Sequence, residues 1–405
     1  TIRPDKRGAI DVARSLALFV VVLGHLVLAV IDRDTSGALR GDNLLALYPH
    51  LSWLTLIAPM PIFFAAGGWA NATATPQTSA TRLRTLMGLG AIVVTLWSTA
   101  SIVELLAAGH GATLSDGARI ATQPLWFLTA YIPFAAYGKR IATFATRPLV
   151  TMGTALAILA AIDIARFGFD ANEKWGWPSF FLAWGIPWVI GSWWRQASCS
   201  PAFNERRVGL VLTIVGIVAG IALVRWAHYY PALIDAVPLK RSNTTPPTLF
   251  TATAAIAQTG VLMMCAASLD SIAQRWRSLI DRMGTASIAV YMWHLSALAL
   301  CSGIIALGAP TPTRLTTLWW LTRPLWFAGV LGVTALFVTA TSSVRTQLRK
   351  RPQHTHHGRT IEIGVVLAVI GAGTIGLYGP RTLPGATIAI IAFIGSWWCL
   401  HATEQ

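Results

Sequence analysis

The sequence predicts an all-α protein, a polytopic bundle of helices embedded in a membrane. Of its 405 residues, 54% are hydrophobic and only 12% are charged, and the mean hydropathy is +0.58. Soluble domains usually contain about 25% charged residues. Apolar runs recur along the chain at lengths of about 17–25 residues, which cross a roughly 30 Å hydrocarbon core as helix. One membrane bundle is therefore favoured over the two or three soluble domains that a chain of this length could form.

Hydropathy in windows of about 19 residues predicts twelve spans. They are 12–31, 51–70, 86–108, 121–138, 148–167, 178–194, 208–227, 248–268, 286–307, 319–342, 361–379 and 384–401. The most basic stretch, 343–360, is interpreted as a cytoplasmic linker. It separates a ten-helix core at 1–342 from two additional helices at 361–405.

The distribution of charge predicts how the bundle is oriented. A formal net charge of +15 and a pI near 10.5 are also typical of nucleic-acid-binding proteins. The basic residues, however, lie between spans and not along one face, so no nucleic-acid partner is expected. With the N-terminus inside, 20 of the 31 lysines and arginines fall in cytoplasmic segments. This bias predicts a multi-pass protein of the cytoplasmic membrane, with both termini in the cytoplasm and lipid as its surroundings.

Three patterns that could indicate ligands have simpler explanations. The segment 371–376 matches G-x-G-x-x-G, but prolines follow closely and no acidic residue appears before Glu404, so helix packing is favoured over a dinucleotide site. His354, His356 and His357 could bind a metal, yet a basic loop on anionic lipid is the favoured interpretation. The four cysteines form no C-x-x-C pair. No metal is predicted.

The first span carries the strongest functional candidates, because ionisable residues inside a membrane are costly. Arg14 and His25 are eleven residues apart. At about 100° per residue they share one helix face, with a rise of about 16 Å between them. Asp11 precedes Arg14 by three positions, within pairing distance on the same stripe. From position alone, His25 could equally be a packing histidine bonded to a neighbouring helix.

Five motifs, taken in order, resemble the acyltransferase 3 family of membrane acyltransferases, which modify cell-envelope sugars and some secondary metabolites. They are Arg14 and His25 with ten residues between them, Met60-Pro-Ile-Phe-Phe-Ala-Ala-Gly-Gly68, Arg82-Leu-Arg84, Pro124-Leu-Trp-Phe-Leu128 and Gly284-Thr-Ala-Ser-Ile-Ala-Val-Tyr-Met-Trp-His294. The resemblance covers about 10–342. Thr85 stands where the family has its second arginine, and the acidic residue that follows the Trp motif in some members is absent.

The resemblance implies an O-acyltransferase of the O-acetyltransferase type. Its donor would be acyl-CoA, with acetyl as the acyl group, and its acceptor a hydroxyl of a carbohydrate or cell-envelope precursor. Trp126 would belong to the substrate-binding residues.

The chemistry can also be argued from the residues. Moving an acyl group from a thioester to a hydroxyl needs a base, and an imidazole suits this role near neutral pH. His25 is the candidate base, grouped with Arg14 and Asp11. Acyl-CoA brings phosphate charges from the cytoplasm, which the fixed fork of arginine binds well. Arg82 and Arg84 are the predicted donor-binding residues, although basic residues there could simply anchor the helix to the membrane surface.

One face of the 286–307 span presents Ser287, Tyr291 and His294 at i, i+4 and i+7. These side chains could hold the acceptor or orient His25, or they could form hydrogen bonds between helices. Three further ionisable residues near the ends of spans, on the outer side, are interpreted as interfacial, with contact to the acceptor as the alternative: Glu104, Asp163 and Arg166. The rival function is a proton-coupled transporter, in which Arg14 and His25 form a relay. Its expected inverted repeats are not found in the sequence.

Overall fold

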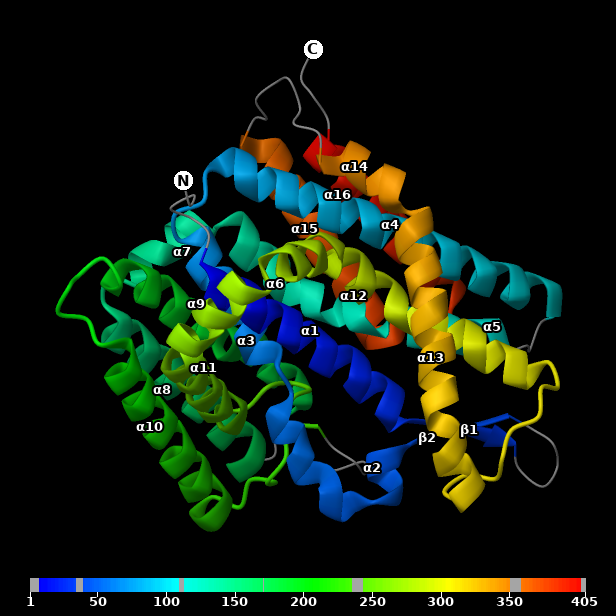
Figure 1. The fold of residues 1–405 in the computed structure, drawn as a ribbon, viewed down its shortest axis with the longest axis horizontal. Helices are drawn as coiled ribbons and strands as arrows, with labels where there is room; N and C mark the ends of the chain where they lie inside the picture. Colours follow the sequence, from blue (N-terminus) through cyan, green and yellow to red (C-terminus); the bar gives the residue numbers. More distant parts are fainter. Residues whose placement is uncertain are drawn as a thin grey trace. The chain divides into compact units, whose positions relative to one another are not determined.

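A computed structural model describes residues 7–33, 39–108, 113–169, 171–234, 243–349 and 358–401 (Figure 1). Nearly all regular structure in these residues is helical, and strands β1 (Ala29–Arg33) and β2 (Leu39–Asn43) form a two-stranded sheet. Ten helices in the described ranges are long and apolar enough to cross a membrane. The prediction of an all-α, polytopic membrane protein is confirmed.

The chain divides into two compact units. Unit 1 comprises 1–23, 43–74 and 137–285, and unit 2 comprises 24–42, 75–136 and 286–405. Two continuous helices contribute residues to both units: α1 (Gly8–Leu28) and α12 (Arg277–Ala306).

Unit 1 is built on pairs of closely packed helices, α3 with α9 and α10 with α11 (Figure 1). Its helices are α2 (Leu44–Leu47), η1 (Pro49–Ile57), α3 (Met60–Asn71), α7 (Gly138–Phe144), α8 (Pro148–Gly168), η3 (Glu173–Gly176), α9 (Ser179–Ala197), α10 (Glu205–Trp226) and α11 (Leu249–Arg275). A Cβ at Gly68 would lie 2.1 Å from the carbonyl oxygen of Trp188, and one at Gly191 would lie 2.0 Å from that of Ala65. Small residues therefore let the backbones of α3 and α9 touch, as in other membrane helix pairs.

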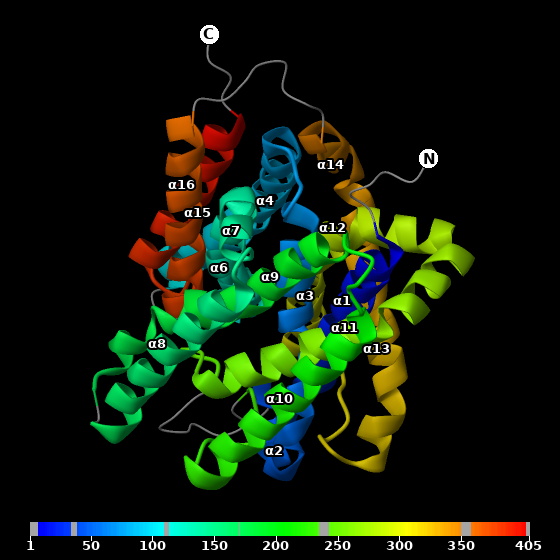
Figure 2. The ribbon, with the colours of Figure 1, turned by 90° about the vertical axis from the view of Figure 1, so that its left-hand side faces the viewer.

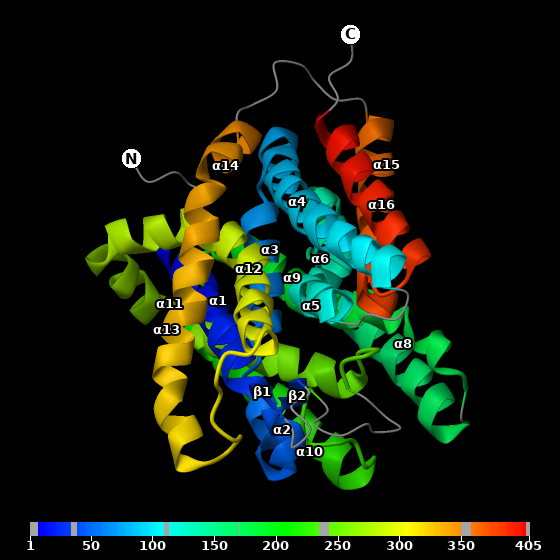
Figure 3. The ribbon, with the colours of Figure 1, turned by 90° about the vertical axis from the view of Figure 1, so that its right-hand side faces the viewer.

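Unit 2 contains the two C-terminal helices. Its helices are α4 (Pro76–Ala108), α5 (Thr113–Thr122), η2 (Gln123–Leu125), α6 (Trp126–Ala136), α13 (Thr317–Ala340), α14 (Ser342–Arg349), α15 (Gly358–Tyr378) and α16 (Leu383–His401). Helices α15 and α16 pack against each other, and α16 also packs on α4 and α15 on α6 (Figure 2 and Figure 3). The segment 371–376 lies within the continuous helix α15, which excludes the strand, turn and helix of a dinucleotide site.

Ten of the twelve predicted spans correspond to helices that meet the length and hydropathy of a membrane crossing. The other two are also helical. The 178–194 span is α9, which is rich in tryptophan and mostly buried, and 121–138 contains the short η2 and α6. Of the predicted linker, residues 350–357 lie outside the described residues, and with them the alternative metal site at His354, His356 and His357.

Candidate active site

Two predicted site residues, His25 and His294, meet in unit 2. Nδ1 of His25 lies 2.9 Å from Nε2 of His294. The two rings are nearly parallel, with an interplanar angle of 20° and centroids 5.1 Å apart. His294 on α12 is fully buried, whereas His25 on α1 is partly exposed. The fold thus joins a partly exposed histidine to a fully buried one.

The surroundings of His294 define which nitrogens carry protons. Nδ1 of His294 faces the carbonyl oxygens of Tyr291 and Val290, at 2.8 and 3.2 Å. Carbonyl oxygens only accept hydrogen bonds, so Nδ1 must be the protonated nitrogen, and Nε2 of a neutral His294 is an acceptor. Nδ1–H of His25 therefore donates to it. The remaining nitrogen, Nε2 of His25, carries a lone pair and makes no hydrogen bond with the described residues.

The helix that carries His294 is held by two further contacts within unit 2. Tyr291 donates its hydroxyl hydrogen to the carbonyl oxygen of Pro124 in η2. Nε1 of Trp97 on α4 donates to Oγ of Ser296, across 3.0 Å. Because the Tyr291 and Ser296 contacts flank His294 along α12, they fix the rotation of this helix.

The other predicted substrate-binding residues lie on the same elements. Trp126 begins α6 directly after η2 and is partly exposed. Its Cβ is 3.2 Å from where a Cβ of Gly376 on α15 would stand, so α15 packs directly on it. Ser287 lies one turn before Tyr291 on α12 and is partly exposed. Tyr291, one turn before His294 on α12, is therefore hydrogen-bonded to η2, and Trp126 directly follows η2 in the chain.

Arg14 and Asp11 lie on the first turns of α1, in unit 1. Arg14 is partly exposed and makes no hydrogen bond or ion pair with another described residue. The predicted pairing of Arg14 with Asp11 is therefore not formed. Within the described part of the chain, no side chain or carbonyl occupies the hydrogen-bond donors of the Arg14 guanidinium.

The two arginines predicted to bind the donor do not share a surface. Arg82 on α4 is exposed, whereas Arg84 is only 1% exposed and reaches Oγ1 of Thr81 at 3.4 Å. Residues two positions apart on a helix point in directions that differ by about 200° around its axis, which explains why Arg82 is exposed and Arg84 is buried. Of this pair, Arg82 alone points outward from the unit.

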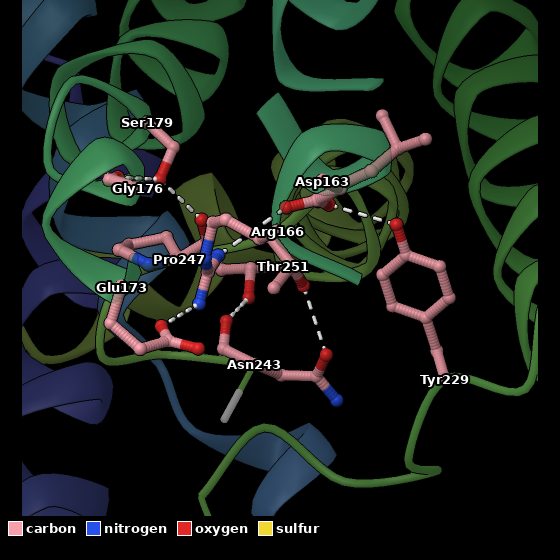
Figure 4. A network of polar contacts seen from close by, with 11 residues as sticks. Asp163, Arg166, Glu173, Gly176, Ser179, Tyr229, Asn243, Pro247 and Thr251 are labelled. Carbon is pink, nitrogen blue, oxygen red and sulfur yellow. Dashed lines mark hydrogen bonds and ion pairs between the residues drawn. The ribbon is translucent and has the colours of Figure 1, made fainter. Parts of the chain in front are cut away.

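Asp163 and Arg166, which the sequence analysis interprets as interfacial, are buried inside unit 1. Their exposed fractions are 1% and 3%, and they form an ion pair with an N–O distance of 3.4 Å (Figure 4). Arg166 also pairs with Glu173 at 2.6 Å. Asp163 accepts hydrogen bonds from the hydroxyl of Tyr229 at 2.8 Å and the backbone N–H of Leu249 at 2.7 Å. This network anchors the first turn of α11 and the segment that follows α10 to α8.

Glu104 likewise serves a helix end. Its carboxylate accepts hydrogen bonds from the backbone N–H groups of Leu114 and Ser115, at 2.9 and 2.8 Å. These donors belong to the first turn of α5, which has no intrahelical partners for them.

Two arginines that the sequence analysis overlooked hold the ends of the histidine-bearing helices. Arg323 on α13 reaches carbonyls at the end of α1, and Arg33 in β1 reaches carbonyls at the end of α12. Arg323 could have been noticed, because it interrupts the apolar run 318–327.

A model of the Acyl_transf_3 family, described as an acyltransferase domain, matches residues 7–343. The chain belongs to the acyltransferase 3 family. Comparisons with curated proteins and with solved structures gave no match. The matched region of this membrane acyltransferase includes both histidines, while α15 and α16 lie beyond it.

Proposed function

We propose that the protein transfers an acyl group, acetyl in the simplest case, from acyl-CoA to a hydroxyl of a carbohydrate or cell-envelope precursor, with His25 as the general base. The observation that carries this proposal is the hydrogen bond between His25 and His294. It leaves an unprotonated Nε2 on a partly exposed imidazole, which is what a base requires.

The reaction can be written with these groups alone. Nε2 of His25 removes the proton of the acceptor hydroxyl while the oxygen attacks the thioester carbonyl. The tetrahedral intermediate collapses, the carbon–sulfur bond breaks, and the CoA thiolate takes the proton from the imidazolium of His25. The products are the acyl ester and free CoA, and His25 returns to its neutral form.

His294 acts in this scheme through His25. A second group that accepts a hydrogen bond from a catalytic imidazole fixes its tautomer and its orientation. An imidazole in this role carries no charge, unlike the carboxylate of a serine hydrolase. It stabilises the imidazolium less, but burying it in a membrane protein costs less.

Arg82 is proposed to bind the donor. Its exposed guanidinium suits the phosphates of CoA, which prefer charged, bidentate donors. Arg14 is on the same helix as His25 and is proposed to belong with Asp11 to the catalytic group. Arg84 lies two positions after Arg82 on α4, is buried, and would act by supporting this helix. The proposed acceptor side comprises Trp126, Ser287 and Tyr291. Ser287 and Tyr291 are on the same helix as His294. Trp126 directly follows η2, to which Tyr291 is hydrogen-bonded.

The proposed setting is the cytoplasmic membrane, with both termini on the cytoplasmic side where acyl-CoA is made available. Mass spectrometry of envelope glycans and lipids, from cells with and without the gene, tests the reaction class and the acceptor together. One species should lose the mass of a single acyl group. Unchanged profiles under conditions in which the protein is produced would count against the proposal.

A further inference from the structure

The end of α1 is held by a buried arginine from another helix. Arg323 on α13 is 8% exposed, and its Nη2 donates hydrogen bonds to the carbonyl oxygens of Leu26 and Ala29, each at 2.7 Å. Helix α1 ends at Leu28, so the carbonyl of Leu26 is one of the last four, which lack an intrahelical partner. Leu26 directly follows His25. The contact therefore lies one residue from the proposed base.

The surroundings of Arg323 suit a cation placed against the end of a helix. Its guanidinium carbon lies 4.3 Å from the ring centroid of Trp319 and 5.3 Å from that of Phe327. No described carboxylate is bonded to it. The negative end of the α1 dipole and the aromatic faces offset the burial of its charge. A leucine would fill this space without that cost, so packing alone does not account for an arginine here.

The helix of His294 ends in the same way. Arg33, in the strand that continues α1, donates to the carbonyl oxygen of Ala306 at 2.9 Å and to that of Ile305. These are the last two residues of α12. Each histidine-bearing helix is thus held at its C-terminus by an arginine. Arg323 holds the end of α1, and Arg33, in the strand β1 that follows α1, holds the end of α12.

The hydrogen bond between the histidines has little tolerance for movement. At 2.9 Å it is at the usual length, and a lengthening of about 0.5 Å would weaken it strongly. We infer that Arg323 is a positioning residue for His25, holding the end of α1 so that Nδ1 of His25 stays aligned with Nε2 of His294. Its catalytic consequence rests on the proposed function of His25 as the base.

The test compares Arg323→Gln and Arg323→Lys with a matched control. Arg345 also donates to a carbonyl near a helix end, that of Val338 at 2.9 Å. Val338 lies at the opposite end of α13 from Arg323, so this contact does not touch the end of α1. For Arg345→Gln we expect turnover of acetyl-CoA within about twofold of the wild type. Arg323→Gln should lower kcat by about tenfold or more with an unchanged KM for acetyl-CoA, a split that marks a loss confined to the transition state. Arg323→Lys keeps the cation but not the fork, and should recover part of the loss.

A second measurement does not depend on catalysis. Nitrogen-15 NMR of the full-length protein with labelled histidine reports the N–H···N hydrogen bond, with His25→Gln and His294→Gln assigning its signals. We expect this signature to be lost in Arg323→Gln and weakened in Arg323→Lys, while Arg345→Gln retains it. If Arg323→Gln cannot be purified as folded protein, Arg323→Lys takes its place in both measurements.

A signature that persists unchanged in the Arg323 variants would overturn the positioning inference, whatever their activity. A signature that is lost while His25→Gln keeps wild-type turnover would leave the inference standing and reject the proposed base. The two failures are therefore distinguishable.

Discussion

Nε2 of His294 accepts a hydrogen bond from Nδ1 of His25 across 2.9 Å, although the two residues are 269 positions apart in the chain. This relationship leaves the ring nitrogens of the two imidazoles differently occupied. His294 has both ring nitrogens occupied, one by carbonyl oxygens and one by His25. Nε2 of His25 makes no hydrogen bond with the described residues, and for this reason His25 is the proposed base and His294 its proposed support.

Replacing His25 with glutamine should abolish detectable transfer. Glutamine keeps a hydrogen-bonding group but cannot accept a proton at neutral pH, and loss of a general base lowers rates by about 10²–10⁴-fold. CoA release by purified protein, with acetyl-CoA as donor and an envelope fraction as acceptor, measures the effect. Expression, insertion and acetyl-CoA binding should stay near wild type. Retention of more than about a tenth of the turnover would mean that His25 is structural.

Two substitutions of His294 should distinguish the effect of the hydrogen bond that it accepts from His25 from the effect of the space that its ring fills. His294→Phe fills similar space but cannot accept from His25, so kcat should fall by about 10–100-fold with little change in the KM for acetyl-CoA. His294→Gln can still accept through its amide oxygen and should retain more activity than His294→Phe. Equal activities of the two variants would reject the tautomer argument.

Hydropathy was sufficient to predict the membrane bundle, because a membrane span is a property of a local segment. The spacing of Arg14 and His25 on one helix face is local as well. The sequence left three alternatives open for His294: holding the acceptor, orienting His25, or bonding to another helix. It could not predict the contact with His25, because that contact depends on how α1 and α12 pack.

In two places the structure adds what the sequence pattern does not contain. Asp163 and Arg166 lie near the end of an apolar run, where charged residues usually face the interface, but their mutual pairing and the N–H groups of α11 allow them to be buried. The sequence predicts Arg82 and Arg84 together as donor-binding residues, although a spacing of two on a helix already implies nearly opposite faces. The burial of Asp163 and Arg166 depends on tertiary packing, whereas the different exposure of Arg82 and Arg84 follows from helix geometry alone.

Because Arg84 is buried and Arg82 is exposed, replacing each arginine with alanine should have a different effect. Arg82→Ala should raise the KM for acetyl-CoA by several-fold while kcat and thermal stability change little, because a charged hydrogen bond contributes on the order of 1.5–3 kcal/mol and this one is partly solvated. Arg84→Ala should instead lower thermal stability, since it removes a buried side chain. Lys139→Ala, an exposed basic residue on the same predicted side, is the control. A KM unchanged by Arg82→Ala would return Arg82 to an anchoring role.

The topology prediction can be tested by labelling. A cysteine introduced at Thr355, with Cys199 and Cys265 replaced by serine, should react with a membrane-impermeant maleimide only after the cells are opened, because the linker is predicted to be cytoplasmic. A cysteine in the segment that joins α12 and α13, such as at Thr313, should show the opposite pattern. Labelling of residue 355 in intact cells would reverse the proposed orientation.

The last prediction concerns the buried network of unit 1. Asp163→Asn preserves the shape of the side chain but removes the charge that faces Arg166, and it weakens the acceptor for Leu249 N–H and Tyr229. Breaking a buried ion pair from one side typically costs about 3–5 kcal/mol, because the other charge stays buried without compensation. Glu173 is half-exposed and still pairs with Arg166, so we expect a loss near the lower limit, measured as a fall in thermal stability in detergent. Adding Arg166→Gln to Asp163→Asn should restore part of the lost thermal stability.

Since neither Asp163 nor Arg166 belongs to the proposed site, the KM for acetyl-CoA of the folded fraction should be unchanged. A double variant no more stable than Asp163→Asn would show that the carboxylate acts through α11 and Tyr229, and not through its arginine partner.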